Sequence, residues 1–194
     1  MIAAALILGL GAAPSLSTDD LAVQALYNFG ACVVEQTPQG ARELLDLDYR
    51  SPAYAKKMRA ISRGHDRCAT ANRLEYNGML FAGALAEALL KSDVKPDELA
   101  ARIGYDPARP AILARSATED MALCTALQAP KETVSLFATQ PATHEEMEAM
   151  TPLGPVLGGC LKKGATVELN KPAIRALLAL AAYRIATMPK APAQ

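Results

Sequence analysis

Cys32-Val-Val-Glu-Gln-Thr-Pro38 and Cys124-Thr-Ala-Leu-Gln-Ala-Pro130 are the two stretches that decide the fold predicted for this 194-residue chain. Each begins at a cysteine and ends at a proline. In both cases a second cysteine follows the first by 36 positions, at Cys68 (68 − 32) and at Cys160 (160 − 124). Equal cysteine spacings in two parts of one chain indicate an internal repeat.

The repeat extends well beyond the cysteines. When the chain is shifted by 92 positions (124 − 32), residues of similar chemistry coincide along both copies. The matched pairs are Pro38 with Pro130, Leu44 with Leu136, Leu45 with Phe137, Ser51 with Thr143, Met58 with Met150, Ile61 with Leu153, Leu85 with Leu177 and Leu89 with Ala181. This pattern predicts a tandem duplication over roughly 20–91 and 112–187.

The four cysteines are expected to form disulfides. Four cysteines allow three pairings. If each unit of the duplication once folded alone, its two cysteines would bond each other, which favours Cys32 with Cys68 and Cys124 with Cys160. Pairing between the units is the alternative. Each bridge would stabilise its unit by roughly 3–4 kcal/mol through loop closure. Metal binding and redox catalysis are disfavoured, because no C-x-x-C spacing occurs.

The composition favours helices throughout. Aromatic residues make up 5% of the chain, tryptophan is absent, and alanine and leucine dominate. Alanine loses no side-chain entropy in a helix and leucine loses little, whereas strands prefer β-branched and aromatic residues. We therefore predict an all-α fold, a tandem duplication of a roughly four-helix unit in which one disulfide clamps each unit.

Prolines and cap residues place the expected helices. Unit 1 covers 18–91 and unit 2 covers 116–188, joined by a linker, 92–115, with a short helix at 96–103. In unit 1 we expect four helices: one at 18–36, one that starts at 38, one that runs from 52 towards Cys68, and one at 78–91. In unit 2 we expect helices at 116–128, at 130–139, from 143 onward, and at 172–187. Thr37 and Ser51 precede prolines and are expected N-caps. Thr143 and Glu146 form a capping box.

The clearest difference between the copies is Thr151-Pro-Leu-Gly-Pro-Val-Leu-Gly-Gly159. Two prolines and three glycines predict that the helix breaks here and leaves an apolar loop beside Cys160. Leu153 and Val156 are the candidate contact residues of that loop. It would serve either as a lid or partner contact, or as a packed turn anchored by the disulfide.

The apolar N-terminal stretch predicts export. Residues 1–17 resemble a signal peptide, with cleavage expected after Ser17 and with Ala13 and Ser15 as alternatives. No lysine or arginine precedes the apolar core, and a helix of the mature fold is the other interpretation. We expect a periplasmic or secreted protein with no transmembrane span in the mature chain and a disordered tail at 189–194.

Two small groups of residues are candidates for chemistry. His65 and Asp66 precede Cys68, but adjacent helical residues point about 100° apart and cannot orient each other, so a solvated helix end is the preferred interpretation. His144 and Glu148 are four residues apart and could share a metal, although no second histidine lies nearby. No nucleophile elbow, dinucleotide-binding turn, P-loop or zincin motif occurs, and no cofactor is predicted.

The two function hypotheses follow from these patterns. Lys+Arg and Asp+Glu are both 20, and a net charge of zero disfavours nucleic-acid binding. We favour an exported binding or scaffolding protein of the cell envelope that holds a protein or a small apolar ligand in a groove between its two units. The alternative is a small secreted hydrolase that uses His65 or His144 as a general base.

Overall fold

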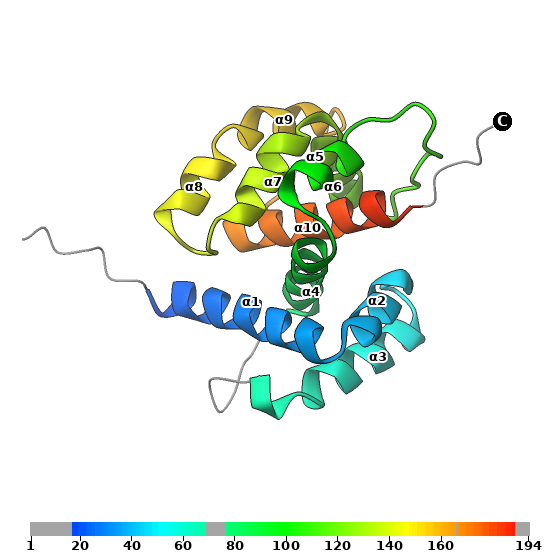
Figure 1. The fold of residues 1–194 in the computed structure, drawn as a ribbon. Helices are drawn as coiled ribbons and strands as arrows, with labels where there is room; N and C mark the ends of the chain where they lie inside the picture. The colour runs from blue at the N-terminus through cyan, green and yellow to red at the C-terminus, as the bar shows by residue number, and fades with distance from the viewer. Residues whose placement is uncertain (1–16, 69–76, 166, 189–194) are drawn as a thin grey trace, which may run out of the picture.

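The computed structural model describes residues 17–68, 77–165 and 167–188. Over these residues the chain forms ten α-helices, one 3-10 helix and no strand, which confirms the all-α prediction (Figure 1). In chain order the helices are α1 (Thr18–Gln36), α2 (Pro38–Asp46), α3 (Pro52–Arg63), η1 (Asp66–Cys68), α4 (Gly78–Asp93), α5 (Pro96–Ile103), α6 (Ala117–Gln128), α7 (Pro130–Ala138), α8 (His144–Met150), α9 (Leu153–Cys160) and α10 (Lys171–Thr187). Residues 1–16 of the predicted signal peptide and the predicted tail, 189–194, lie outside the described residues.

The predicted disulfide pairing is confirmed. Cys32 bonds Cys68, and Cys124 bonds Cys160, with Cα–Cα distances of 5.6 and 5.7 Å. In each half the first cysteine lies in the first long helix and the second ends a short helix about halfway along the unit. This common arrangement is consistent with the predicted duplication.

The predicted loop at 151–159 is wrong. Only Thr151 and Pro152 interrupt the helical path, and α9 begins at Leu153. Pro155 is tolerated because it lies in the first turn of α9, where a backbone N–H has no partner within the helix. Burial of Leu153, which is 0% exposed, and the disulfide at Cys160 offset the weak helix propensity of the glycines.

The expected helix caps are confirmed at Ser51 but not at Thr37. The Ser51 hydroxyl accepts a hydrogen bond from the backbone N–H of Tyr54 at 3.1 Å. The Thr37 side chain makes no cap bond and instead contacts His65. At Thr143 the hydroxyl accepts from Glu146 N–H, while the Glu146 carboxylate accepts from the N–H of Ala142 rather than of Thr143.

The two units share one core. Helix α4 stands between α1 and α10 in Figure 1 and is buried on most of its surface, as expected for a helix that is apolar on all sides. Glycine permits its closest approaches: a Cβ on Gly83 would lie 2.4 Å from the Cβ of Ala176 in α10. A single cluster of buried apolar side chains therefore runs through both halves.

The predicted linker also contributes to this core. Its short helix occurs at 96–103 as expected and ends at Gly104. Leu99 and Ile103 are 3% and 0% exposed, and α5 packs against α7 and α10. The linker helix is thus part of the second half. Among the described helices, none has the length and apolarity needed to cross a membrane.

Candidate functional site

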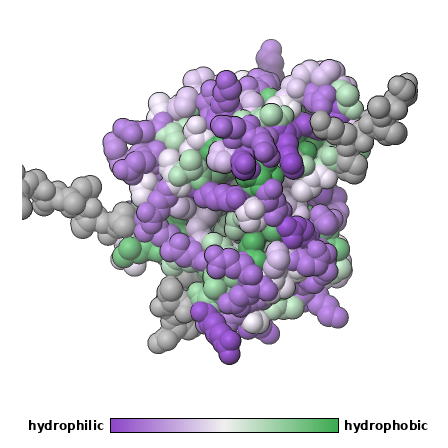
Figure 2. Space-filling model, in the orientation of Figure 1, coloured by the Kyte–Doolittle hydropathy of each residue, from purple (hydrophilic) through white to green (hydrophobic). Residues whose placement is uncertain are grey.

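The candidate site is a groove between the two units, which we call the inter-unit groove. It encloses about 380 Å³. Unit 1 contributes the end of α2, the start of α3 and the start of α4, and unit 2 contributes the segment before α6, the first turn of α6 and one face of α10. Figure 2 shows mostly hydrophilic residues on the face drawn, with smaller hydrophobic areas between them. The apolar lining of the groove therefore contrasts with the surface in that view.

Helix α10 supplies the floor of the inter-unit groove. Leu177, Leu180, Ala181 and Arg184 all line it. Their spacing of three and four residues places them on one face of the helix, so a single stripe of α10 presents three apolar side chains and then one arginine. The groove therefore has an apolar interior and a charged end.

Tyrosine side chains also line the inter-unit groove. Tyr54 lies in the first turn of α3, where the Ser51 cap fixes the start of the helix, and Tyr183 projects from α10. Burial raises the pKa of Tyr54 to about 12. Burial, and then the negative charge of Asp46, raise the pKa of Tyr183 to about 12. Both side chains are therefore neutral at physiological pH and offer rings with hydroxyl groups.

An ion pair holds the charged end of the inter-unit groove. Arg184 Nη1 contacts Glu119 Oε1, and Arg184 Nη2 donates to the backbone oxygen of Leu113 at 3.3 Å. The second carboxylate oxygen of Glu119 accepts the backbone N–H of Arg115 at 2.5 Å. Ser116 caps α6 by accepting from Glu119 N–H at 3.2 Å. These bonds fix the first turn of α6 against α10 and engage both oxygens of Glu119.

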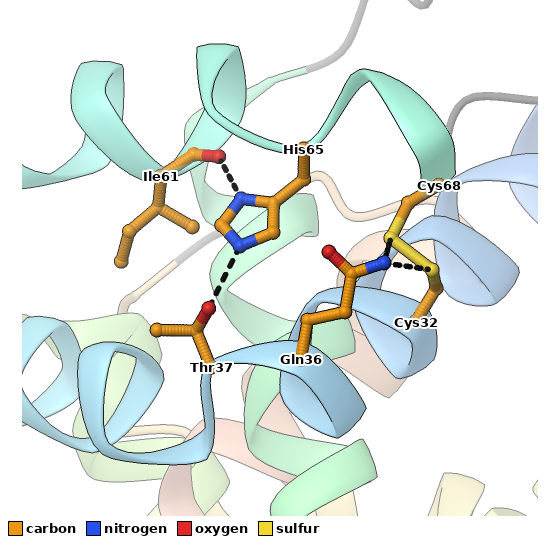
Figure 3. Close-up of a disulfide and its surroundings, with 6 residues drawn as sticks. All are labelled: Cys32, Gln36, Thr37, Ile61, His65 and Cys68. Carbon is orange, nitrogen blue, oxygen red and sulfur yellow. Dashed lines mark hydrogen bonds between the residues drawn. A yellow bond between two sulfur atoms is a disulfide. The ribbon is translucent and has the colours of Figure 1, made fainter.

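The structure gives His65 a structural position (Figure 3). Its Nδ1 lies 2.9 Å from the carbonyl oxygen of Ile61, which can only accept, so Nδ1 carries the proton. In the neutral ring Nε2 then accepts from the Thr37 hydroxyl, also at 2.9 Å. Asp66 is exposed, and among the described residues the hydrogen bonds of this ring go to Thr37 and Ile61 instead. The predicted solvated helix end is thus wrong for His65, which joins the end of α3 to the start of α2.

A glutamine follows the first cysteine of each disulfide by four residues. The amide of Gln36 donates to the sulfur of Cys32 at 3.5 Å and to that of Cys68 at 3.2 Å, as Figure 3 shows, and the amide of Gln128 donates to the sulfur of Cys124 at 3.1 Å. A spacing of four residues brings the amide over the sulfur on one helix face. A hydrogen bond from this glutamine to the first cysteine is therefore a further feature that the two halves share.

The other candidates lie outside the inter-unit groove. His144 Nε2 is 3.4 Å from Glu148 Oε1, but the two side chains are 78% and 69% exposed, and no group of three metal-ligating side chains occurs among the described residues. Leu153 is fully buried and so belongs to the core rather than to a contact surface. Val156 is half-buried on α9. None of these four residues lines the groove.

A buried ionic network joins the units and was missed by the sequence analysis. Arg175 of α10 is fully buried and bonds Glu87 of α4 at 2.7 and 2.8 Å and Glu146 of α8 at 2.8 Å. It also donates to the Thr139 carbonyl at 2.8 Å and lies over the Tyr27 ring. Burial alone would lower the pKa of Arg175, but its hydrogen bonds to Glu87 hold that pKa above its usual value. The sequence signal that could have revealed this network is a charged residue within an apolar stretch of helix, Glu87 in α4 and Arg175 in α10.

Comparison of the chain with known protein families, with curated protein sequences and with solved structures found no match. Inference about function therefore depends on the chemistry and geometry of the inter-unit groove.

Proposed function

We propose that this protein is an exported binding protein that holds a small, mainly apolar molecule in the inter-unit groove. The observation that carries the proposal is the groove itself, with a volume of about 380 Å³ and a lining of leucine, methionine and tyrosine side chains. Pockets for small molecules typically enclose about 300–1,000 Å³ and combine an apolar lining with a few polar groups. Of the two ligand classes expected from the sequence, a small molecule fits this volume better than a protein.

Export is supported by the two disulfides, because such bonds persist mainly in oxidising compartments. The start of α1 bears on the cleavage site. The Ser17 hydroxyl accepts from Asp20 N–H, and the Asp20 carboxylate accepts from Ser17 N–H, both at 3.1 Å. Cleavage after Ser17 would remove this capping box, whereas cleavage after Ala13 or Ser15 would keep it. We propose that one of the latter two sites is used.

The hydrolase alternative receives no support from a specific contact. Both ring nitrogens of His65 are engaged by Thr37 and Ile61, and His144 is exposed on α8. Neither histidine lines the inter-unit groove. We therefore develop the binding function alone.

The test uses a tryptophan reporter. Because the chain has no tryptophan, Tyr54→Trp places a single fluorophore in the groove wall. Tyr105→Trp is the matched control, since Tyr105 is 78% exposed and lies outside the groove. Titration with a neutral apolar probe, decan-1-ol, is expected to change the emission of Tyr54→Trp and not of Tyr105→Trp. Equal responses, or none, would contradict the proposal.

Native mass spectrometry of the protein from a periplasmic host adds an independent measurement. We expect a mass that retains Ser17, contains two disulfides and includes a bound small molecule that is lost on denaturation. Free thiols with an intact Met1 would overturn export.

A further inference from the structure

We infer that the molecule bound in the inter-unit groove carries a carboxylate at one end and that Arg115 binds this group. The inference rests on the proposed function and specifies its ligand as an amphipathic monocarboxylate. It starts from the cations at the charged end of the groove, which differ in whether an acid already neutralises them.

Two of these cations are neutralised within the chain: Arg184, which lines the groove, and Arg50, which lies beside the lining residue Tyr49. Arg184 pairs with Glu119 across α10 and α6. Arg50 donates to both oxygens of Asp48, at 3.1 and 3.0 Å, and these hydrogen bonds are the main cause that lowers the pKa of Asp48 to about 2. Both acids are therefore occupied by their own arginines.

Arg115 is different. It lines the groove and is half-buried, yet its guanidinium forms no ion pair with any carboxylate among the residues that the structure describes. Both nearby acids are engaged elsewhere. Asp48 accepts from Arg50. Glu119 accepts the backbone N–H of Arg115 and the side chain of Arg184. Of the five charged groups at this end, three arginines and two acids, one positive charge is thus left in excess.

The guanidinium of Arg115 is also held in place. Its central carbon lies 5.7 Å from the centre of the Tyr49 ring, and Tyr49 itself lines the groove. Stacking on an aromatic face leaves the N–H edge of the guanidinium free to bond, and that edge matches the two oxygens of a carboxylate. The backbone bond from Arg115 to Glu119 fixes the same residue from the other side.

The rest of the inter-unit groove suits the apolar part of such a ligand. Beyond the charged end, the lining includes Leu177, Leu180 and Ala181 together with the neutral tyrosine side chains. A molecule with an acid at one end and a hydrocarbon or aromatic body would place each part against matching chemistry. A cationic amphiphile would instead meet the excess positive charge.

The experiment compares three probes of the same chain length: decanoate, decan-1-ol and decylamine. The two ionic probes are kept below their micelle-forming concentrations and decan-1-ol below its solubility limit. Binding is measured in the Tyr54→Trp background, with Arg115→Gln and the control Lys56→Gln, which removes one charge from an exposed position of α3 outside the groove. We expect decanoate to bind about tenfold more tightly than decan-1-ol. Arg115→Gln is expected to remove that advantage and to leave decan-1-ol binding unchanged, whereas Lys56→Gln changes neither.

The outcomes separate this inference from the proposed function. Equal binding of decanoate and decan-1-ol, unaffected by Arg115→Gln, would overturn the carboxylate inference and leave the apolar site intact. Tighter binding of decylamine would also overturn it. Absence of binding by all three probes would overturn both proposals. Circular dichroism of each variant shows whether the fold is retained, and Arg115→Lys, which keeps the charge without the planar fork, should retain part of the preference.

Discussion

Substitution of Gly83 by alanine should destabilise the protein through one contact between α4 and α10. A Cβ at this position would lie 2.4 Å from the Cβ and 2.5 Å from the Cα of Ala176. Carbon atoms at ordinary separation lie about 3.5–4.0 Å apart, so the two helices must move apart by about 1 Å. Ala176 cannot yield by rotating, because its backbone is part of the contact and the residue is fully buried.

The magnitude is a balance of two effects. Alanine is favoured over glycine inside a helix by about 1 kcal/mol. Overpacking of a buried contact costs roughly 1–3 kcal/mol, and the upper end applies here because backbone rather than a flexible side chain obstructs the new methyl group. We therefore expect a net loss of about 2 kcal/mol in the free energy of unfolding. For a chain of this size that loss lowers Tm by roughly 4–8 °C.

The assay is unfolding followed by circular dichroism, with the disulfides intact. The matched control is Gly158→Ala in α9, where an added Cβ would meet nothing within 4 Å. That variant should gain roughly 0.5–1 kcal/mol from helix propensity and reduced chain entropy. Opposite signs for the two variants are the expected result. A Gly83→Ala protein as stable as the unsubstituted protein would refute the argument that this close approach sets the packing of the units.

Three further predictions concern buried charge and tyrosine. Glu87→Ala should lower the free energy of unfolding, measured in guanidinium chloride, by about 3–5 kcal/mol, because it leaves Arg175 with one carboxylate. The control Lys91→Ala removes a side chain that is 48% exposed and should cost far less. Equal losses would contradict a stabilising role of the network. Tyr27→Phe should leave the free energy of unfolding in urea unchanged or raise it by up to about 1 kcal/mol, because the Tyr27 hydroxyl is buried and lacks a hydrogen-bond partner among the described residues. A clear loss of stability would show that the hydroxyl is bonded. Tyr54 and Tyr183 have a pKa of about 12 in the folded protein and 10.0 in the unfolded chain, so the unfolded chain ionises first and stability should fall between about pH 10 and 12. Near-ultraviolet absorbance of the folded protein should show these two tyrosines ionising above pH 10. Their ionisation near pH 10 would contradict their burial.

Features that depend on nearby residues were predictable. The α5 bounds matched because Pro96 starts the helix and Gly104 ends it, and the Ser51 cap matched because it needs only the following three residues. Local rules failed where tertiary contacts outweighed propensity. In α9, glycines and a proline indicated a loop, but the buried Leu153 and the Cys160 disulfide stabilise a helix.

The candidate site could be predicted only as a location. A groove between two similar units was expected, but the residues singled out beforehand, from His65 to Val156, do not line it. Its lining combines α2, α3, α4, α6 and α10, which are far apart in the chain. The excess charge of Arg115 could not be predicted either, since it depends on which acids pair with Arg50 and Arg184.

By itself the sequence determined the helical class and the cysteine pairing, because helix propensity acts within a few residues and a repeated spacing of 36 distinguishes one pairing among three. The tertiary structure alone decided how α4 crosses α10, where Arg175 finds its two carboxylates, and which side chains meet in the inter-unit groove. Those outcomes depend on close packing and on burial of charge between segments separated by tens of residues, and no local pattern encodes the distance between them.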